Sequence, residues 1–159
     1  MPFTPPATYA SKSTTGYLGT FEIGDAASPP NWALVSELKS FKGNYFSTPA
    51  VNVSHLCSPN ATEEERPGLM KPGTVDFSGN FIGDTAQLNL LQYAQNNADQ
   101  NPPTYPFRAK MPVQNGTKTY TCTGIGFVSK YEVGPTELNK PIEFAGALQI
   151  TGIVSEAVA

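Results

Sequence analysis

The side chains best suited to catalysis or metal binding lie close together in one stretch of this chain. His55, the only histidine, is followed by Cys57 in a His-x-Cys spacing. A zinc site needs about four protein ligands, or three and a water molecule, and no Cys-x-x-Cys or Glu-x-x-His follows nearby. A catalytic Cys-His or Ser-His-Asp set would need His55 as its base, and no nucleophile motif such as Gly-x-Ser-x-Gly occurs. We therefore interpret His55 as a lone loop histidine and predict no metal site.

An acidic run at 63–65 and a glycine pair at 124–126 are the other features that could carry chemistry. The three adjacent glutamates cannot converge on one substrate bond, and such a run is typical of a solvated loop. The glycine pair lacks the third glycine of a phosphate-binding loop and falls in an expected strand. The sequence therefore predicts a protein that is not an enzyme and that holds no cofactor.

The composition favours β structure with many turns. Of 159 residues, 39% are apolar and 14% are charged, and there are 15 prolines and 14 glycines. Prolines and glycines at this density supply turns and interrupt long helices, and the length fits a single domain. The net charge of −3 argues against tight DNA binding, because a weakly acidic surface does not attract phosphates.

Apolar runs are too short for a membrane span or for the core of a signal peptide. We therefore expect no membrane partner and synthesis in a reducing cytoplasm. Cys57 and Cys122 could form a disulfide, but free thiols are favoured in that compartment.

The first half of the chain predicts an N-terminal arm, several strands and one long loop. Residues 1–16 contain prolines and a Ser/Thr cluster without periodicity, which is typical of an extended arm, and the domain itself is expected over 17–159. Strands are expected at 17–23, 32–41 and 44–53, with Pro49 marking an edge or a bulge in the last of them. Residues 54–73 then form the longest irregular segment.

One helix is expected, directly after a strand. Residues 74–82 alternate between apolar and polar side chains, as a half-buried strand does. Asp84, with Gln87 three positions later, resembles a capping box and predicts a helix over about 85–96. The expected apolar stripe of this helix consists of Ala86, Leu90 and Ala94, widened by Leu88 and Leu91.

The last third of the chain predicts a hairpin and a long final strand. Strands are expected at 104–113, 117–131 and 142–153, with an Asn-Gly hairpin turn at 115–116 and a loop at 134–141. Most aromatic residues fall on the apolar faces, which favours a core over a platform for sugars or nucleic acid. The expected fold is mainly β, an antiparallel β-sandwich or barrel with one packed α-helix.

The polar faces of the expected strands carry short side chains that are mostly uncharged. Thr, Ser, Asn, Gln and Ala prevail, and Asp76 and Glu143 are the notable charges. Such a face could be an ordinary solvent face that lacks lysine. It could also line a water-filled channel, formed when the sheets of neighbouring copies join in a ring. The residues alone leave both interpretations open.

The order of the elements is itself a pattern. Its features are a proline-bearing N-terminal arm, a Trp-containing strand at 31–34, an acidic loop at 63–73 that closes on Gly-Leu and a second glycine, a strand at 75–81 flowing into a helix at 85–95, and a last strand ending in Leu-Gln-Ile-Thr-Gly at 148–152. In this order the chain resembles the major tail tube proteins of long-tailed, lambda-like (siphovirus) bacteriophages. The resemblance covers nearly the whole chain. Related folds occur in the inner tubes of contractile tails and of type VI secretion.

The resemblance implies a structural virion protein. Hexameric rings of such subunits stack into the tail tube, the conduit for DNA ejection into the host. Inner strands of the subunits join into one barrel around a lumen, through which DNA passes without specific binding. The implied partners are further copies of the chain, the tape measure protein, and tail-tip and terminator proteins. The implied location is the virion tail, assembled in the host cytoplasm.

On this hypothesis the polar strand faces line the lumen, and the long loop and the N-terminal arm connect adjacent rings. The lumen-lining candidates are Asp76, Ser78, Asn80, Thr119, Thr121, Glu143 and Gln149. Neutral or negative side chains there would repel phosphates and let DNA slide. The inter-ring contact candidates are Glu63, Glu64, Glu65, Arg66, Pro67 and Leu69, together with residues 1–16.

The alternative is a β-sandwich module that binds a carbohydrate or a protein partner. Such a module would show an exposed cluster of aromatic side chains and would stay monomeric.

Overall fold

The computed structural model describes residues 19–159, so the expected N-terminal arm, 1–16, lies outside the described residues. The strands are β1 (Thr20–Gly24), β2 (Trp32–Leu34), β3 (Leu38–Ser47), β4 (Ala50–Asn52), β5 (Glu65–Pro67), β6 (Lys71–Asn80), β7 (Tyr105–Val113), β8 (Lys118–Val133), β9 (Glu143–Ile150) and β10 (Ser155–Val158). The helical elements are the helix α1 (Thr85–Gln95) and the short 3-10 turns η1 (Pro59–Ala61) and η2 (Asn96–Ala98). Eight strands form one sheet in the order β2-β1-β7-β8-β9-β6-β3 with β10 on β8, and β4 pairs with β5 separately.

The sheet folds over on itself around β8. Residues 118–126 of this strand pair with β7, and residues 126–133 pair with β9. At the change of partner, a Cβ on Gly126 would lie 2.3 Å from the backbone oxygen of Gln149, so only glycine lets the two strands approach this closely. Gly126 is therefore explained by the bend in the sheet, whereas Gly124 leaves room for the Phe107 ring, which would lie 2.7 Å from a Cβ at that position.

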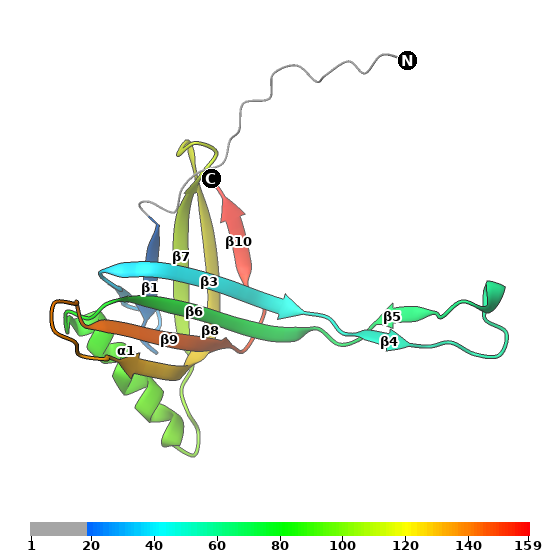
Figure 1. Cartoon of the computed structure of the whole chain (residues 1–159), viewed down its shortest axis with the longest axis horizontal. Coiled ribbons are helices and arrows are strands. Elements are labelled where there is room, and N and C mark those ends of the chain that lie inside the picture. The colour runs from blue at the N-terminus through cyan, green and yellow to red at the C-terminus, as the bar shows by residue number, and fades with distance from the viewer. Residues whose placement is uncertain (1–18) are drawn as a thin grey trace, which may run out of the picture.

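The two parts of the folded sheet are called here the β7 half and the β6 half. The β7 half consists of β1, β2, β7, β10 and residues 118–126 of β8; the β6 half consists of β3, β6, β9 and residues 127–133 of β8. Their strands run in steeply different directions (Figure 1). The ring of Phe21 in β1 lies 5.2 Å from that of Phe41 in β3 and 5.5 Å from that of Phe77 in β6. The inner faces thus pack on each other as in an orthogonal sandwich, which confirms the predicted fold class.

The core lies between the two halves and is rich in aromatic rings. Its largest fully buried side chains are Phe21, Phe107, Phe144, Ile23, Leu90, Leu148, Ile150, Gln87, Val75, Val128 and Cys122. Among the aromatic side chains of residues 19–159, Phe46 alone is exposed. Because burial of large apolar side chains is the main stabilising contribution in a domain of this size, the aromatics serve the core, as predicted.

The predicted strand at 32–41 is wrong, because the chain turns a corner within it. β2 belongs to the β7 half and β3 to the β6 half, and the three residues between them, 35–37, make the crossing. Val35 is buried and its backbone N–H donates to the carbonyl of Phe21 (2.9 Å). Glu37 takes a φ of 57°, in the left-handed region that a continuous strand does not use.

The predicted last strand at 142–153 also ends early. β9 stops at Ile150, and the N–H of Thr151 donates to the carbonyl of Ile125 (2.9 Å). After a link at 151–154, β10 pairs with residues 120–123 of β8 and places Glu156 opposite the buried Cys122. β10 was not predicted from the sequence, because its four residues are exposed and show no alternation.

Helix α1 begins where the sequence predicts, but its buried stripe is different. Asp84 caps the helix by accepting a hydrogen bond from the N–H of Gln87 (2.9 Å). Ala86 and Leu90 are buried as expected, whereas Leu88 and Leu91, expected to widen the stripe, are exposed. The fully buried side chain of Gln87 takes their place. At about 100° per residue, position 88 lies on the face opposite the buried residues 86, 87 and 90, and position 91 lies at the border of the buried face.

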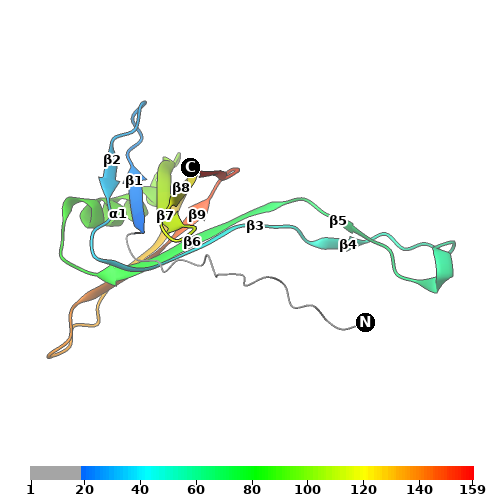
Figure 2. The ribbon, with the colours of Figure 1, turned by 90° about the horizontal axis from the view of Figure 1, so that it is seen from above.

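The predicted loop at 54–73 is largely a hairpin. β4 and β5 pair with each other, and β6 already begins at Lys71. Pro49 separates β3 from β4, and its carbonyl accepts a hydrogen bond from the N–H of Gly68 (2.8 Å). Residues 48–70, called here the projecting hairpin, extend away from the sandwich in the direction of β3 and β6 (Figures 1 and 2).

Candidate functional site

The predicted lumen candidates divide between two opposite surfaces. Asp76, Ser78, Asn80, Glu143 and Gln149 lie together on the outer face of the β6 half, where neighbouring strands bring Asn80 opposite Glu143 and Thr74 opposite Gln149. Thr119 and Thr121 lie on residues 118–126 of β8, on the outer face of the β7 half. Because the two inner faces pack together, the two outer faces point away from each other. One channel wall therefore cannot contain all of these residues.

The outer face of the β6 half, called here the β6 face, carries charges of both signs. β3 and β8 add lysines that the sequence analysis did not place on this face. Lys39 binds Glu143 (2.5 Å), Lys42 lies opposite Asp76 in the register, and Lys130 binds Glu132 (3.0 Å). The predicted neutral or negative face is therefore a mixed one, in which lysines offset carboxylates.

A way to find these lysines existed in the sequence. Once β3 is known to run over 38–47, its alternation puts Lys42 and Asn44 on the polar side, next to Ser40. Ser40 and Ser78 confirm the placement, because their hydroxyl oxygens lie 2.6 Å apart across the strands. Because the expected strand ended at residue 41, it did not include Lys42 and Asn44, and their place on the polar side was missed.

The β6 half has two edges without a strand partner among the described residues. β3 pairs only with β6, and residues 127–133 of β8 pair only with β9 on one side. Helix α1 contacts β8, and the side-chain amide of Asn97 donates to the carbonyl of Val128 (2.6 Å) at that place. Long strand edges present unpaired N–H and C=O groups and are ready to pair with another chain.

The outer face of the β7 half carries a compact charged cluster. Glu22 accepts a hydrogen bond from Nε of Arg108 (2.6 Å) and lies 3.5 Å from Nζ of Lys110. The Arg108 guanidinium stacks 4.4 Å from the centre of the Trp32 ring. The hydrogen bond from Arg108 holds the pKa of Glu22 below its usual value, against the opposing effect of burial. Thr121 lies opposite Lys110, so this lumen candidate is a neighbour of the charged cluster.

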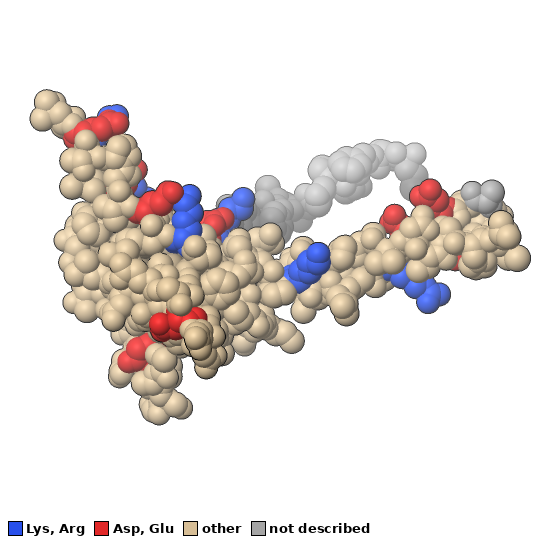
Figure 3. Space-filling view, turned by 90° about the horizontal axis from the view of Figure 1, so that it is seen from below, with Lys and Arg blue, Asp and Glu red and all other residues tan. Residues whose placement is uncertain are grey.

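The projecting hairpin exposes most of the predicted inter-ring residues. Glu63, Glu65, Arg66, Pro67 and Leu69 are exposed. Figure 3 shows acidic atoms gathered near the far part of the hairpin and basic atoms on its other side.

Glu64 differs from its neighbours, because it belongs to the internal bonding of the hairpin. Its N–H donates to Oγ of Ser54 (2.7 Å), its carbonyl accepts from the N–H of Val53 (2.8 Å), and its carboxylate lies 3.9 Å from Nε2 of His55. Nδ1 of His55 accepts a hydrogen bond from the backbone N–H of Cys57 (3.1 Å) rather than contacting the thiol. His55 thus helps to shape the end of the hairpin.

The projecting hairpin also exposes apolar side chains that its own two strands do not cover. Val51, Leu56 and Leu69 are all exposed. An isolated two-stranded ribbon is at best marginally stable in water, and exposed apolar patches mark interaction sites. The hairpin is therefore a candidate interaction surface.

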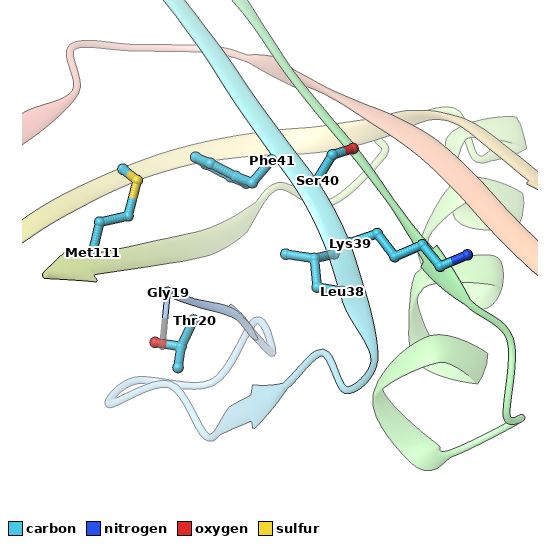
Figure 4. Close-up of a pocket in the computed structure, with 7 residues that line it drawn as sticks. All are labelled: Gly19, Thr20, Leu38, Lys39, Ser40, Phe41 and Met111. Atoms are coloured by element: carbon cyan, nitrogen blue, oxygen red, sulfur yellow. The ribbon is translucent and has the colours of Figure 1, made fainter. Parts of the chain in front are cut away.

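Cavities in the sandwich lack converging chemical groups. The opening between β1, β3 and the end of β7 has a volume of about 260 Å³. In Figure 4, Phe41 and Met111 face this opening, whereas the Lys39 amine points away from it. Within residues 19–159, no group of three or more His, Cys, Asp or Glu side chains could hold a metal ion. None of the helices in this part of the chain has the length and apolar character needed to cross a membrane. Cys57 is exposed, Cys122 is buried, and both are free.

No known protein family and no curated protein sequence matches the chain. Solved structures do match it by fold. A chain in the anti-feeding prophage cap, the AFP tube terminating cap, matches with a TM-score of 0.68 and 15% identity over 100% of both chains. A chain in the tail of an empty GTA particle with C6 symmetry gives 0.68 and 12% identity over 91% of this chain and 99% of that one. The SPP1 tail tube gives 0.57 and 14% identity over 88% of this chain and 75% of that one.

These likenesses define the class of the fold. The chain has the fold of tail tube and tube terminator proteins, which are structural components of phage tails and phage-like injection systems. The matching chains come from a baseplate, a tail and a sheath/tube terminator.

Proposed function

We propose that this chain is the tube subunit of a long-tailed phage or phage-like particle, and that hexameric rings of it stack into the tail tube that conducts DNA into the host. The observation that carries the proposal is the projecting hairpin. It continues β3 and β6 beyond the sandwich, exposes apolar and acidic side chains, and makes no strand pairing with the described body. A monomeric protein gains nothing from such an extension, whereas a stacked one uses it to reach the next copy.

The β6 half closes the ring in this proposal. Its edges, β3 on one side and residues 127–133 of β8 on the other, join those of neighbouring copies into one barrel, which removes both edges at once. The β6 face then lines the lumen, with Asp76, Ser78, Asn80, Glu143 and Gln149. Thr119 and Thr121 lie on the outside of the tube.

The mixed charges of the β6 face suit a conduit for DNA. Lys39 and Lys130 are each engaged by a carboxylate, so neither is free to hold a phosphate. Short hydroxyl and amide side chains fill the space between them. A wall of this kind gives DNA no continuous positive track to bind, which supports passage without specific binding.

The hairpin and the N-terminal arm connect adjacent rings in the proposal. Glu63, Glu65, Arg66, Pro67 and Leu69 contact the next ring directly, and Glu64 acts through the hydrogen bonds that shape the hairpin. Residues 1–16 add a second connection. Further partners are the tape measure protein inside the tube and tail-tip and terminator proteins at its ends. The place of action is the virion tail, assembled in the host cytoplasm.

A lambda-like, siphovirus tail remains our proposal for the particle. The chain resembles tubes of contractile injection systems as well, including one described as a sheath-tube complex. A tube without a surrounding sheath in particles that contain this chain would support the proposal. A sheath around the tube would assign the chain to a contractile tail, and the proposed tube function would still hold.

Negative-stain microscopy of the purified chain tests the function. Rings or tubes with a central channel are the expected result. Featureless monomeric particles would overturn the proposal and favour the alternative, a binding module. That alternative lacks the exposed aromatic cluster it needs, because Phe46 is the single exposed aromatic side chain among residues 19–159.

A further inference from the structure

An open apolar groove lies where the projecting hairpin leaves the sandwich. It has a volume of about 370 Å³ and runs between the end of β3, the start of β6 and the 151–154 link. Its lining includes Tyr45, Phe46, Met70, Pro72, Ile153 and Val154. Phe46 is 61% exposed and Ile153 is 83% exposed, so the apolar walls of the groove face solvent in a single copy. A concave apolar surface of this size is typical of a binding site for another molecule or chain.

A matching projection lies at the other end of the same strands. The loop between β8 and β9, residues 134–141, carries Leu138 at 91% exposure. The loop is held in shape rather than loose. The N–H of Gly134 donates to the carbonyl of Glu143 (2.8 Å), and Lys140 forms an ion pair with Glu137. A fixed loop that presents one large apolar side chain is an anchor of the kind found at the centre of interfaces.

We propose that Leu138 of one copy seats in this groove of a second copy stacked end to end with it. The proposal rests on the tube function and names the contact between rings. The groove lies at the start of β6 and the end of β9, whereas the loop lies just before the start of β9. Figures 1 and 2 show this loop and the hairpin at opposite ends of the long axis. A contact between two different surfaces at opposite ends repeats without closing, and it therefore builds a stack.

The hairpin supports the same stacking direction. It starts at the groove, because β3 ends at Ser47 and β6 begins at Lys71. When the loop of the second copy enters the groove, the hairpin of the first copy runs on alongside that second copy. Both contacts therefore form in one step. The groove and the hairpin lie at the same end of the molecule. The end of another copy's hairpin could therefore enter the groove only if that copy pointed in the opposite direction.

Charges around the two surfaces fit as well. Glu156 lines the groove, and Lys71 precedes the lining residue Pro72 in β6. Glu137 and Lys140 flank Leu138 on the loop, with one charge of each sign. The ion pair within the loop can exchange for pairs across the contact without leaving any charge unpaired.

Cysteine cross-linking of assembled protein tests the contact. The variant Leu138→Cys/Ile153→Cys, in a Cys57→Ser background, should give a ladder of multimers with a short bis-maleimide, and each single cysteine variant should not. The pair Leu138→Cys/Leu88→Cys is the matched control, because Leu88 is also exposed but lies on α1. Tubes in which the first pair cross-links no more than the control would overturn the proposal.

Cross-linking would also show whether a different segment of the chain occupies the groove. Cross-linking of Ile153→Cys to the native Cys57 would place the end of a hairpin in the groove, and cross-linking to Ala7→Cys would place residues 1–18 there. Either result overturns the proposal.

A charge at the anchor gives an independent readout. Leu138→Asp should leave rings intact and reduce the number of tubes at least tenfold, with an unchanged circular dichroism spectrum. Normal tubes from this variant would overturn the contact and leave the tube function standing. Absence of rings and tubes in the unmodified protein would overturn the tube function itself, and this contact with it.

Discussion

Replacing Gln87 by methionine should lower the free energy of unfolding by about 2–4 kcal/mol. The buried amide makes four hydrogen bonds. Its Oε1 accepts from the N–H groups of Ile82 (2.9 Å) and Gly83 (3.0 Å), and its Nε2 donates to the carbonyls of Ser36 (3.1 Å) and Asn80 (3.0 Å). Methionine keeps the volume but removes every one of these bonds, each worth about 1 kcal/mol net. The sum is about 4 kcal/mol, and the loss is smaller where a backbone group left unpaired can bind water instead.

Urea unfolding of the unassembled protein, followed by the fluorescence of Trp32, measures this loss. With a denaturant slope of roughly 2 kcal/mol/M, the midpoint should fall by about 1–2 M at an unchanged slope. Gln92→Met on the exposed side of the same helix is the matched control and should change little. A loss below about 0.5 kcal/mol, or equal losses in the two variants, would refute the view that this amide ties α1 to the corner at 35–37 and to the end of β6.

The remaining predictions concern the hairpin, the thiols and one carboxylate. Changing residues 63–65 from glutamate to lysine should preserve the fold, because the hairpin stands clear of the body, and should impair tube formation; micrographs showing tubes of normal length and stability would contradict the inter-ring assignment. Cys57 should react with a thiol reagent in the native protein and Cys122 only after unfolding, so a native count of two reactive thiols would show that Cys122 is not buried. The pKa of Glu22 is lowered in the folded state, so its contribution to stability is present above its unfolded value, about 4.3, and is lost as the pH falls through the lower folded value. Unfolding measured between neutral pH and pH 3 should therefore depend less on pH in Arg108→Gln, and equal slopes for the two proteins would rule out this ion pair as a source of the pH dependence.

The periodic parts of the sequence predicted the fold well. Alternation in 74–82 and around 143–150 identified β6 and β9 and their buried faces, because a strand with one dry face must alternate. The cap at Asp84 located the helix to within a residue. These signals are local, and each is set by the residues that carry it.

The features that failed depend on contacts between distant parts of the chain. Glu37 adopts a left-handed conformation without a glycine or asparagine to signal it, because the corner is imposed by the two sheet halves. Alternation shows that Thr121 and Asp76 both point outward, but it cannot show that their faces look in opposite directions. The projecting hairpin escaped prediction because β4 and β5 are only three residues long and contain or adjoin prolines.

The low share of charged residues can be explained by where the exposed apolar side chains lie on the surface. Charged residues make up only 14% of the chain, which is few for a surface that meets water everywhere. The five most exposed large apolar side chains among residues 19–159, however, lie toward the two ends of the long axis. Leu56 and Leu69 lie on the projecting hairpin, Phe46 and Ile153 at its base, and Leu138 at the opposite end of the long axis. The β6 face between these ends is polar and mixed in charge. A subunit whose two ends are covered by its neighbours needs charge only on the surfaces that stay wet, so the composition and the placement of its apolar residues have the same explanation.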